Sequence, residues 1–159
     1  MRAYVALGSN LGDSKQHLLD AMEALAALPH SEMMARSRIY RTPPWGVVDQ
    51  PDFLNAVVAL ETSLEPHELL DALLAIERAA GRQRNGERWG PRTLDLDLLY
   101  VGDRTVNDER LNLPHPHIAD RAFVLLPLHD VAPDLAIPGQ GKVADLLRAV
   151  DTQGCKPLA

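Results

Sequence analysis

The 159-residue sequence predicts an α+β fold with a ferredoxin-like core, in which strands and helices follow the order β-α-β-β-α-β. Two segments, residues 13–28 and 66–81, carry apolar side chains at helical spacing, and two strand-like segments lie between them. A further strand-like segment precedes the first helix and another follows the second. We therefore expect a mainly antiparallel sheet with helices packed on it, followed by a C-terminal helical extension.

The first half of the chain supplies a strand, a helix and two further strands. Residues 2–7 form a short apolar run typical of a buried strand, and residues 8–12 have the composition of a turn. Asp13 and Gln16 then have the spacing of a capping box, which predicts a helix that ends near Leu28. The next strands are expected at residues 33–41 and 53–62.

The second half completes the core and adds the extension. Pro66 in the first turn and Gly81 just past the end bound the second helix, because proline suits a helix start and glycine a helix end. Residues 93–101 alternate and are rich in leucine, which predicts the last core strand. The later elements are expected to be a small hairpin around residues 102–104 and helices at 121–129 and 143–150.

Composition restricts the kind of protein and its partners. With 46% hydrophobic residues and no linker, residues 1–159 are expected to form a single catalytic domain, and we expect a monomer because no heptad pattern is present. Cys155 is the sole cysteine, which excludes an intramolecular disulfide. The formal net charge of -6 argues against nonspecific binding to nucleic acid or membranes. No apolar run has the length of a membrane span, and a strand-like segment takes the place of a signal sequence, so we expect a cytoplasmic protein.

Asp95 and Asp97 form the most informative pair of side chains. They lie two residues apart in a predicted strand, so they project from one face with Cα atoms roughly 6.6–6.8 Å apart. Mg²⁺ suits carboxylate oxygens together with substrate phosphates, so the pair predicts metal-assisted phosphoryl chemistry on a nucleotide. The alternative is that both aspartates form the solvated face of an edge strand, with Leu94, Leu96 and Leu98 packed inward.

An arginine-rich segment just before this strand favours the phosphate interpretation. The chain is acidic overall, so a local cluster of cations indicates a local anion. Guanidinium groups bind phosphate through paired hydrogen bonds. The arginines between Gly81 and Thr93 are Arg82, Arg84, Arg88 and Arg92.

Two long loops, residues 42–52 and 81–92, are candidates for lids, because loops of this length are commonly functional. Trp45 and Trp89 lie near their centres, where an aromatic ring can pack on a planar heterocycle or a nucleotide base. Each tryptophan can equally hold its loop against the body of the protein. Asn55, inside an otherwise apolar strand, can bind the polar edge of a ring or nearby backbone groups.

Together these segments resemble the signature of the 6-hydroxymethyl-7,8-dihydropterin pyrophosphokinase family of folate biosynthesis. The similarity covers about residues 3–138, and its blocks are residues 8–12, 40–44, 52–56, 87–99, 113–116 and 121–133. The resemblance implies a ferredoxin-like enzyme that transfers diphosphate from ATP to the hydroxymethyl group of 6-hydroxymethyl-7,8-dihydropterin and releases AMP.

The resemblance also assigns roles to individual residues. Asp95 and Asp97 would hold two Mg²⁺ ions, and Arg82 and Arg92 would neutralise charge as the diphosphoryl group moves. The residues implied to contact ATP are Glu77, Arg84, Arg88, Arg110, His115 and Arg121. The pterin would lie between Phe53 and Phe123, and the residues implied to contact it are Thr42, Pro43, Pro44, Trp45, Phe53, Asn55, Trp89 and Phe123.

The chain departs from the family pattern at a few positions of the expected pocket. Trp45 stands where a smaller aliphatic residue is common, Phe53 where tyrosine is frequent, and Pro116 where some relatives have tyrosine. Leu74 lacks the polar group that relatives can place near the nucleotide. These differences concern the shape of the pocket and leave the expected class of substrate unchanged.

Two other classes of protein share the predicted fold. A noncatalytic ligand-sensing module would not need an aspartate pair that faces an arginine-rich loop. A binder of single-stranded RNA would need stacking aromatics on the central strands and a basic face, whereas this chain has few strand aromatics and a negative charge. Magnesium-dependent release of AMP from ATP with a reduced pterin distinguishes the enzyme from both.

Overall fold

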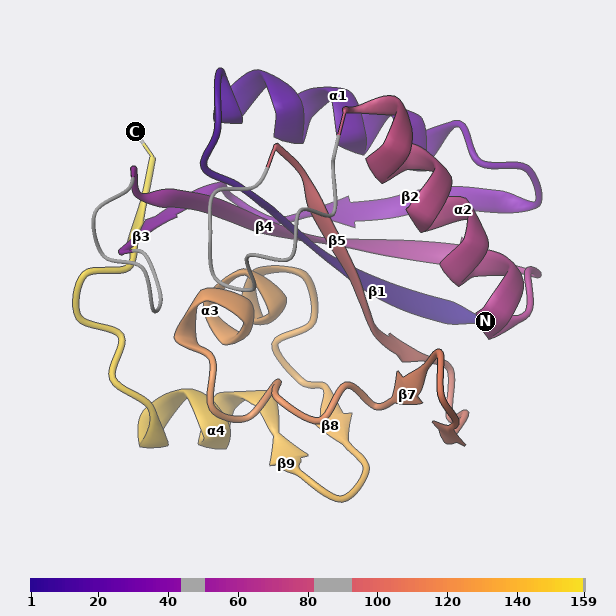
Figure 1. Ribbon diagram of the computed structural model, residues 1–159. Helices are drawn as coiled ribbons and strands as arrows, with labels where there is room; N and C mark the ends of the chain where they lie inside the picture. Colours follow the sequence, from indigo (N-terminus) through magenta and orange to yellow (C-terminus); the bar gives the residue numbers. More distant parts are fainter. Residues whose placement is uncertain (44–50, 82–92, 159) are drawn as a thin grey trace.

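The computed structural model describes residues 1–43, 51–81 and 93–158, and its elements follow the predicted order (Figure 1). The core elements are β1 (Arg2–Ser9), α1 (Ser14–Ala26), β2 (Ser31–Arg36), β3 (Tyr40–Thr42), β4 (Phe53–Thr62), α2 (Pro66–Ala79) and β5 (Asp95–Val101). The later elements are β6 (Val106–Asn107), β7 (Asn112–Leu113), α3 (Ala122–Val131), β8 (Ala136–Ile137), β9 (Gly141–Lys142), α4 (Val143–Ala149) and β10 (Lys156–Pro157). The predicted core is confirmed, with its second strand divided into β2 and β3.

The strands form one large antiparallel sheet. Within the described residues it has six strands in the order β10-β3-β4-β1-β5, and β2 also pairs with β4. The central pair is β1 and β4, whose register runs from Arg2 opposite Glu61 to Ser9 opposite Leu54. β5 lies at one edge of this order, while β10 pairs with β3 at the other. The sheet therefore confirms the predicted antiparallel architecture.

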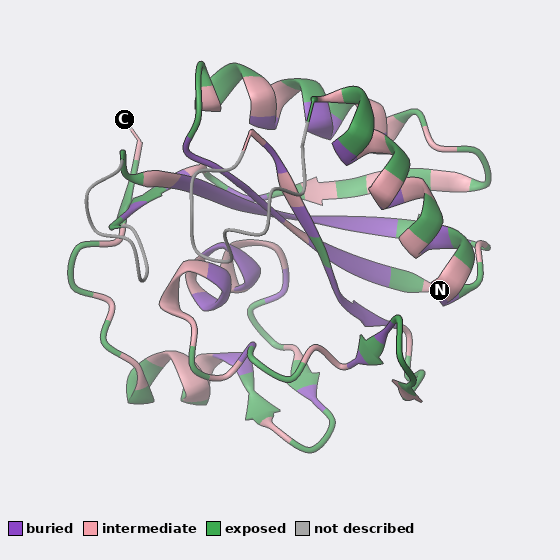
Figure 2. Ribbon diagram, viewed as in Figure 1, coloured by how far each residue is buried: buried purple, intermediate pink, exposed green. Residues whose placement is uncertain are grey.

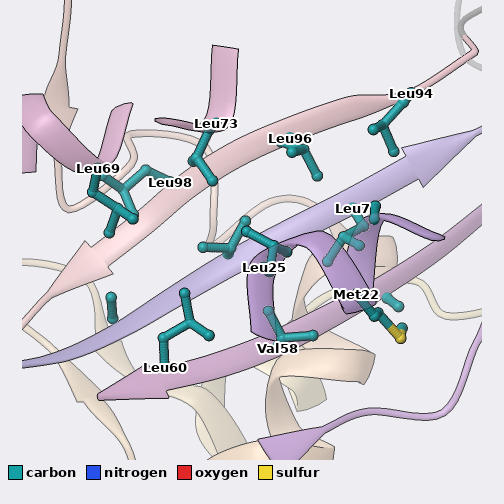
Figure 3. Close-up of a cluster of buried hydrophobic side chains, with 14 of the residues drawn as sticks. Leu7, Met22, Leu25, Val58, Leu60, Leu69, Leu73, Leu94, Leu96 and Leu98 are labelled. Carbon is teal, nitrogen blue, oxygen red and sulfur yellow. The ribbon is translucent and has the colours of Figure 1, made fainter. Parts of the chain in front are cut away.

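Helices cover both faces of the sheet. α1 and α2 lie over one face, and α3 and α4 lie over the other (Figure 1). The core beneath α1 and α2 joins Leu7 and Leu60 of the central strands to Leu25 of α1 and Leu73 of α2 (Figure 3). This layer is the main apolar core of the molecule.

A second core lies between the sheet and α3. Tyr4, Val57 and Leu99 from the sheet pack with Val124 and Leu128 of α3. β4 is consequently buried on both faces over most of its length (Figure 2). Burial on both faces explains why the sequence of β4 is a nearly continuous apolar run rather than an alternation.

The two core helices begin with different caps. Before α1, the side chain of Asp13 accepts a hydrogen bond from the backbone N–H of Gln16 at 3.3 Å. The Gln16 side chain donates to Asp20 at 2.8 Å, so the second half of the predicted capping box is not formed. Glu65 and Glu68 make a complete capping box at the start of α2, where a proline occupies the first turn as predicted.

The strand predicted at residues 33–41 is wrong in one respect, because it is interrupted after Arg36. From Arg36 to Tyr40 the chain advances by four residues, whereas the partner positions in β4, Val58 and Asn55, are three apart. This difference makes a bulge of one residue. The Ser37 side chain spans the bulge by accepting a hydrogen bond from a β4 amide at 2.8 Å.

The chain after β5 also differs in detail from the prediction. It turns at residues 102–103, but the hairpin lies further on, where β6 pairs with β7 through Val106 and Leu113. α3 and α4 confirm the two predicted C-terminal helices. In the described parts of the chain, no helix is long and apolar enough to cross a membrane.

Candidate active site

A row of residues crosses the sheet on the face covered by α3. The row consists of Tyr40, Asn55, Gly8 and Asp95, which are paired in register across β3, β4, β1 and β5. Directly opposite residues of antiparallel strands share a face, with Cβ atoms about 4.5–5.5 Å apart. Asp97 lies two residues beyond Asp95 in β5 and therefore projects from the same face.

The two aspartates of β5 differ in exposure. Asp95 is partly buried and Asp97 is exposed, while Leu94, Leu96 and Leu98 are buried against the other face. This confirms the predicted alternation of the strand. Both carboxylates therefore lie on the α3 side of the sheet, Asp95 within the row and Asp97 next to it.

Gly8 leaves room between the polar members of the row. A Cβ atom on Gly8 would lie 3.0 Å from Nδ2 of Asn55 and 4.0 Å from the Cβ of Asp95. The sequence analysis assigned Gly8 to a turn, but β1 continues to Ser9. A glycine within an apolar strand often marks a point where another group approaches the backbone closely, so the sequence did carry a signal for Gly8.

Asn55 is held in one orientation by its neighbour in β3. The hydroxyl of Thr42 donates to Oδ1 of Asn55 at 2.7 Å, and both side chains are buried. The amide nitrogen is therefore directed away from Thr42, toward the space above Gly8. Phe53 begins β4 and pairs with Thr42, which places an aromatic ring at the same end of the sheet.

Glu77 contacts the backbone of β5 between the two aspartates. Its side chain is 3% exposed and its carboxylate accepts a hydrogen bond from the Leu96 N–H at 2.7 Å. Among the strands of the described residues, β5 lies at the edge of the sheet, so none of them pairs with this N–H on that side. Glu77 in α2 thus fixes the backbone that carries Asp95 and Asp97, a contact that the sequence analysis missed.

His115 follows β7 and is held by backbone hydrogen bonds. Its N–H donates to the Leu99 carbonyl at 2.8 Å, and its own carbonyl accepts from Gln140 at 2.9 Å. Burial and the nearby charge of Arg121 lower the pKa of His115 to about 4. The backbone N–H of His117 donates to Nδ1 of this neutral ring at 3.1 Å, which leaves the proton on Nε2 as a donor.

Two further predicted ATP contacts lie in different places. Arg121 precedes α3, and its guanidinium carbon lies 5.7 Å from the ring centre of Phe123, which is partly buried. Arg110 lies between β6 and β7 and forms an ion pair with Asp71 of α2. Pro43, which is a predicted pterin contact, is exposed directly after β3.

The structure brings some predicted residues together and leaves others outside its description. Thr42, Phe53, Asn55, Asp95 and Asp97 share one face of the sheet. Seven predicted residues lie outside the described residues, namely Pro44, Trp45, Arg82, Arg84, Arg88, Trp89 and Arg92.

The donor chemistry of the aspartate pair suits a cation shared with a substrate. Among residues 1–43, 51–81 and 93–158, no group of three or more His, Cys, Asp or Glu side chains could hold a metal ion. Asp95 and Asp97 supply two carboxylates from one strand face, which leaves ligand positions for water or a phosphate. Mg²⁺ is commonly bound in this way.

The fold is α+β, and the aspartate pair gives the site the oxygen donors that suit metal-assisted phosphoryl transfer. A family model described as 7,8-dihydro-6-hydroxymethylpterin-pyrophosphokinase (HPPK) matches residues 4–133. The chain belongs to this family.

Individual relatives agree with this assignment. A 2-amino-4-hydroxy-6-hydroxymethyldihydropteridine pyrophosphokinase of Methylorubrum extorquens is 52% identical over 153 residues, covering 96% of each chain. The protein of the same name from Pseudomonas aeruginosa is 48% identical over 157 residues, covering 99% of this chain and 96% of the relative.

Solved structures support the fold alone. A structure of a single-site variant of Plasmodium falciparum HPPK-DHPS with pteroate has a TM-score of 0.75 and 15% sequence identity. The alignment covers 93% of this chain and 40% of that one. The wild-type structure from the same organism, without a named ligand, gives a TM-score of 0.72 at 14% identity.

Proposed function

We propose that this chain transfers the diphosphate group of ATP to the hydroxymethyl group of 6-hydroxymethyl-7,8-dihydropterin in folate biosynthesis, and that Mg²⁺ bound by Asp95 and Asp97 assists the transfer. Membership of the pyrophosphokinase family supports the reaction. The structural observation that carries the proposal is the row on the sheet, in which Asn55, Gly8 and Asp95 lie in register. The row supports the proposal because Asn55, the proposed pterin contact, lies in it beside the carboxylate pair.

The proposed metal site uses oxygen donors only. Asp95 and Asp97 would hold two Mg²⁺ ions, because two carboxylates on one face supply oxygen ligands of the kind that Mg²⁺ takes together with substrate phosphates. When bound, Mg²⁺ would neutralise phosphate charge. Glu77 holds the backbone between the aspartates, so the strand that carries both carboxylates is in place before ATP binds.

The proposed pterin position lies between the sheet and α3. Asn55 offers its amide to the polar edge of the ring, because Thr42 holds the amide in one orientation. Phe53 and Phe123 supply aromatic faces, from the start of β4 and the first turn of α3. Pro43, Pro44, Trp45 and Trp89 complete the set that we assign to the pterin.

The proposed ATP contacts combine a neutral donor with guanidinium groups. His115 would donate a hydrogen bond from Nε2, because its low pKa excludes a charged ring at pH 7. Arg110 and Arg121 would bind phosphate or ribose oxygens, and Glu77 would lie near the nucleotide. Within residues 82–92 we assign Arg84 and Arg88 to ATP, and Arg82 and Arg92 to charge that develops during transfer.

The reaction requires no protein nucleophile. The hydroxymethyl oxygen of the pterin attacks the β-phosphorus of ATP, the bond from that phosphorus to the oxygen shared with the α-phosphate breaks, and AMP leaves with that oxygen. The hydroxyl proton passes to solvent. Catalysis of phosphoryl transfer is mostly positioning and electrostatic stabilisation, which matches a site of anchored polar groups.

The test is a product analysis. With ATP, Mg²⁺ and 6-hydroxymethyl-7,8-dihydropterin, the chain is expected to form AMP and the pterin diphosphate in equal amounts. Leaving out the pterin or adding EDTA should stop AMP formation. Formation of ADP, or AMP release that does not depend on the pterin, would contradict the proposal.

We also propose a single catalytic domain that is monomeric and cytoplasmic. Light scattering after size exclusion should give a mass near 17.5 kDa. Twice that mass would contradict the monomer, and recovery of the native protein in a membrane fraction would contradict the cytoplasmic location.

A further inference from the structure

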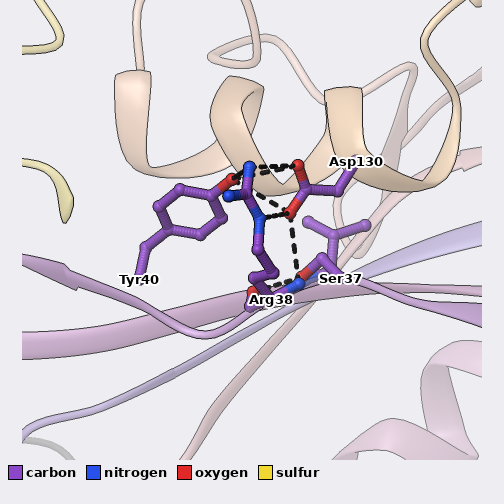
Figure 4. Close-up of polar contacts among 5 residues, drawn as sticks. Ser37, Arg38, Tyr40 and Asp130 are labelled. Carbon is purple, nitrogen blue, oxygen red and sulfur yellow. Dashed lines mark hydrogen bonds and ion pairs between the residues drawn. The ribbon is translucent and has the colours of Figure 1, made fainter. Parts of the chain in front are cut away.

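A polar cluster at the β3 end of the row joins α3 to the sheet (Figure 4). It consists of Arg38, Tyr40 and Asp130, and we call it the α3 clamp. The Asp130 carboxylate accepts hydrogen bonds from Nε and Nη2 of Arg38 at 3.2 and 3.0 Å. The Tyr40 hydroxyl lies 3.0 and 2.9 Å from the two carboxylate oxygens and accepts from Arg38 Nη2 at 2.8 Å.

The clamp has one exposed member and two shielded members. The Arg38 side chain is 64% exposed, the Asp130 side chain is 16% exposed, and Tyr40 is buried. Partial burial raises the pKa of Asp130, but hydrogen bonds from Arg38 and Tyr40 outweigh it and hold that pKa below its ordinary value. Burial and Asp130 together raise the pKa of Tyr40 to about 12, so the clamp keeps one charge state near neutral pH.

The clamp joins the two sides of the proposed pterin position. Tyr40 is the β3 member of the row and lies opposite Asn55. Asp130 lies in the same helix as Phe123, seven residues later and thus about 10 Å further along the axis. A shift of α3 against β3 would therefore change the separation between Asn55 and Phe123.

The other contacts of α3 with the sheet in the described residues are mainly apolar. Val124, Leu125 and Leu128 pack against the sheet, and apolar packing is not directional. Pro127 lies inside α3 and has no N–H, so the helix lacks one internal hydrogen bond. A guanidinium paired with a carboxylate through two nitrogens has a defined geometry, which apolar contacts lack.

We propose that Arg38, Tyr40 and Asp130 act as positioning residues that set the gap between α3 and the sheet in which the pterin ring binds. The inference rests on the proposed function. The geometry of the α3 clamp depends on the bulge after Arg36, which interrupts the strand where Arg38 turns toward α3.

The test compares the affinities for the two substrates in folded variants. Asp130→Asn and Tyr40→Phe are expected to raise the Kd for 6-hydroxymethylpterin at least about fivefold, and to leave the Kd for α,β-methylene-ATP with Mg²⁺ within about twofold. Asp130→Glu should restore most of the pterin affinity. Asp145→Asn is the matched control, because Asp145 pairs with Arg148 within α4 at 3.0 Å and lies outside the clamp.

The outcomes are distinct. If the variants melt at a lower temperature but bind the pterin as tightly as the wild type, the clamp is only a structural contact and the inference is overturned. If both substrate affinities fall equally, the role in positioning the pterin is also overturned. Should Asp130→Asn fail to fold, Tyr40→Phe decides, because it removes a single hydroxyl. A wild-type protein that neither binds the pterin nor forms AMP would overturn the proposed function itself.

Discussion

At the scale of single residues, the candidate site depends on Gly8, because a glycine has no side chain to fill the space beside Asn55. Gly8 lies between Asn55 and Asp95 in the row, with strand partners on both sides. The sequence around it resembles a turn, because glycine, serine and asparagine cluster there. Pairing with β4 and β5 overrides this local preference and extends β1 to Ser9.

Gly8→Ala is expected to narrow the proposed pterin position. The added Cβ would lie 3.0 Å from Nδ2 of Asn55, so the amide must move. We expect the Kd for the pterin to rise about tenfold, with a stability loss of about 1–3 kcal/mol from overpacking. Fluorescence titration and denaturant melts measure both.

The double variant Gly8→Ala/Asn55→Ala supplies the control for this prediction. Removal of the amide should relieve the crowding, so the stability losses of the two single variants should not add. Additive losses would show that Gly8 and Asn55 do not interact.

Asp97→Asn tests the proposed metal site with little change of shape. Turnover should fall at least about a hundredfold, which corresponds to about 2.7 kcal/mol of lost transition-state stabilisation. The rise in melting temperature that ATP analogue and Mg²⁺ produce together should also disappear. Asp103→Asn, in the turn beyond the other end of β5, should change neither, and full activity of Asp97→Asn would exclude a metal role for this carboxylate.

At the scale of elements, α2 and β5 show how a helix supports a functional strand. β5 is the edge strand of the sheet order, and Glu77 of α2 supplies the hydrogen-bond acceptor that a neighbouring strand would otherwise provide. The start of α2 was predicted from Pro66, because the preference of proline for the first turn is local in sequence. The contact of Glu77 with Leu96 was not, because it joins residues 19 positions apart through the packing of helix on strand.

Glu77→Ala is expected to destabilise the fold and to disturb catalysis together. It leaves the buried Leu96 N–H without its acceptor, which costs about 1–3 kcal/mol in the free energy of unfolding. Glu77→Gln retains an acceptor oxygen and should cost clearly less. Denaturant melts and titrations with an ATP analogue separate the explanations, since a residue that only contacts nucleotide would lower affinity in both variants at unchanged stability.

At the scale of the whole molecule, buried titratable groups define the pH range of stability. The folded state holds the pKa of His115 at about 4, below the ordinary 6.5, so between these values the unfolded chain binds more protons and stability falls as the pH falls. The folded state raises the pKa of Tyr40 to about 12 from 10.0, so its contribution is complete below pH 10.0 and is lost as the pH rises toward 12. Between about pH 7 and 10, neither His115 nor Tyr40 therefore lowers the stability.

His115→Gln tests the acid side of this range. Between pH 6.5 and 4, the wild type should lose on the order of 2 kcal/mol of its free energy of unfolding through His115. The loss is smaller than a fully buried ring would give, because the ring keeps some contact with solvent. The variant should show a flatter dependence over the same interval, measured by denaturant melts at a series of pH values. Equal slopes in both proteins would mean that other groups control acid stability.

The sequence by itself determined the order of the elements, the start of α2 at Pro66, and the placement of Asp95 and Asp97 on one face of β5. These features depend on neighbours within a few residues, through period-two alternation and local hydrogen bonds. Composition and spacing also singled out the arginines of residues 82–92, the two tryptophans and Asn55, and the resemblance to a known family supplied the remaining candidate residues. It assigned their roles without their contacts.

Only the tertiary structure decided the strand register, and with it the row from Tyr40 to Asp95, the bulge after Arg36 and the clamp on Asp130. The physical reason is that register is fixed by pairing between strands far apart in the chain and by the packing of helices on both faces. A local pattern shows which side chains share a face of one strand. The residues opposite them on the next strand are chosen when the sheet assembles.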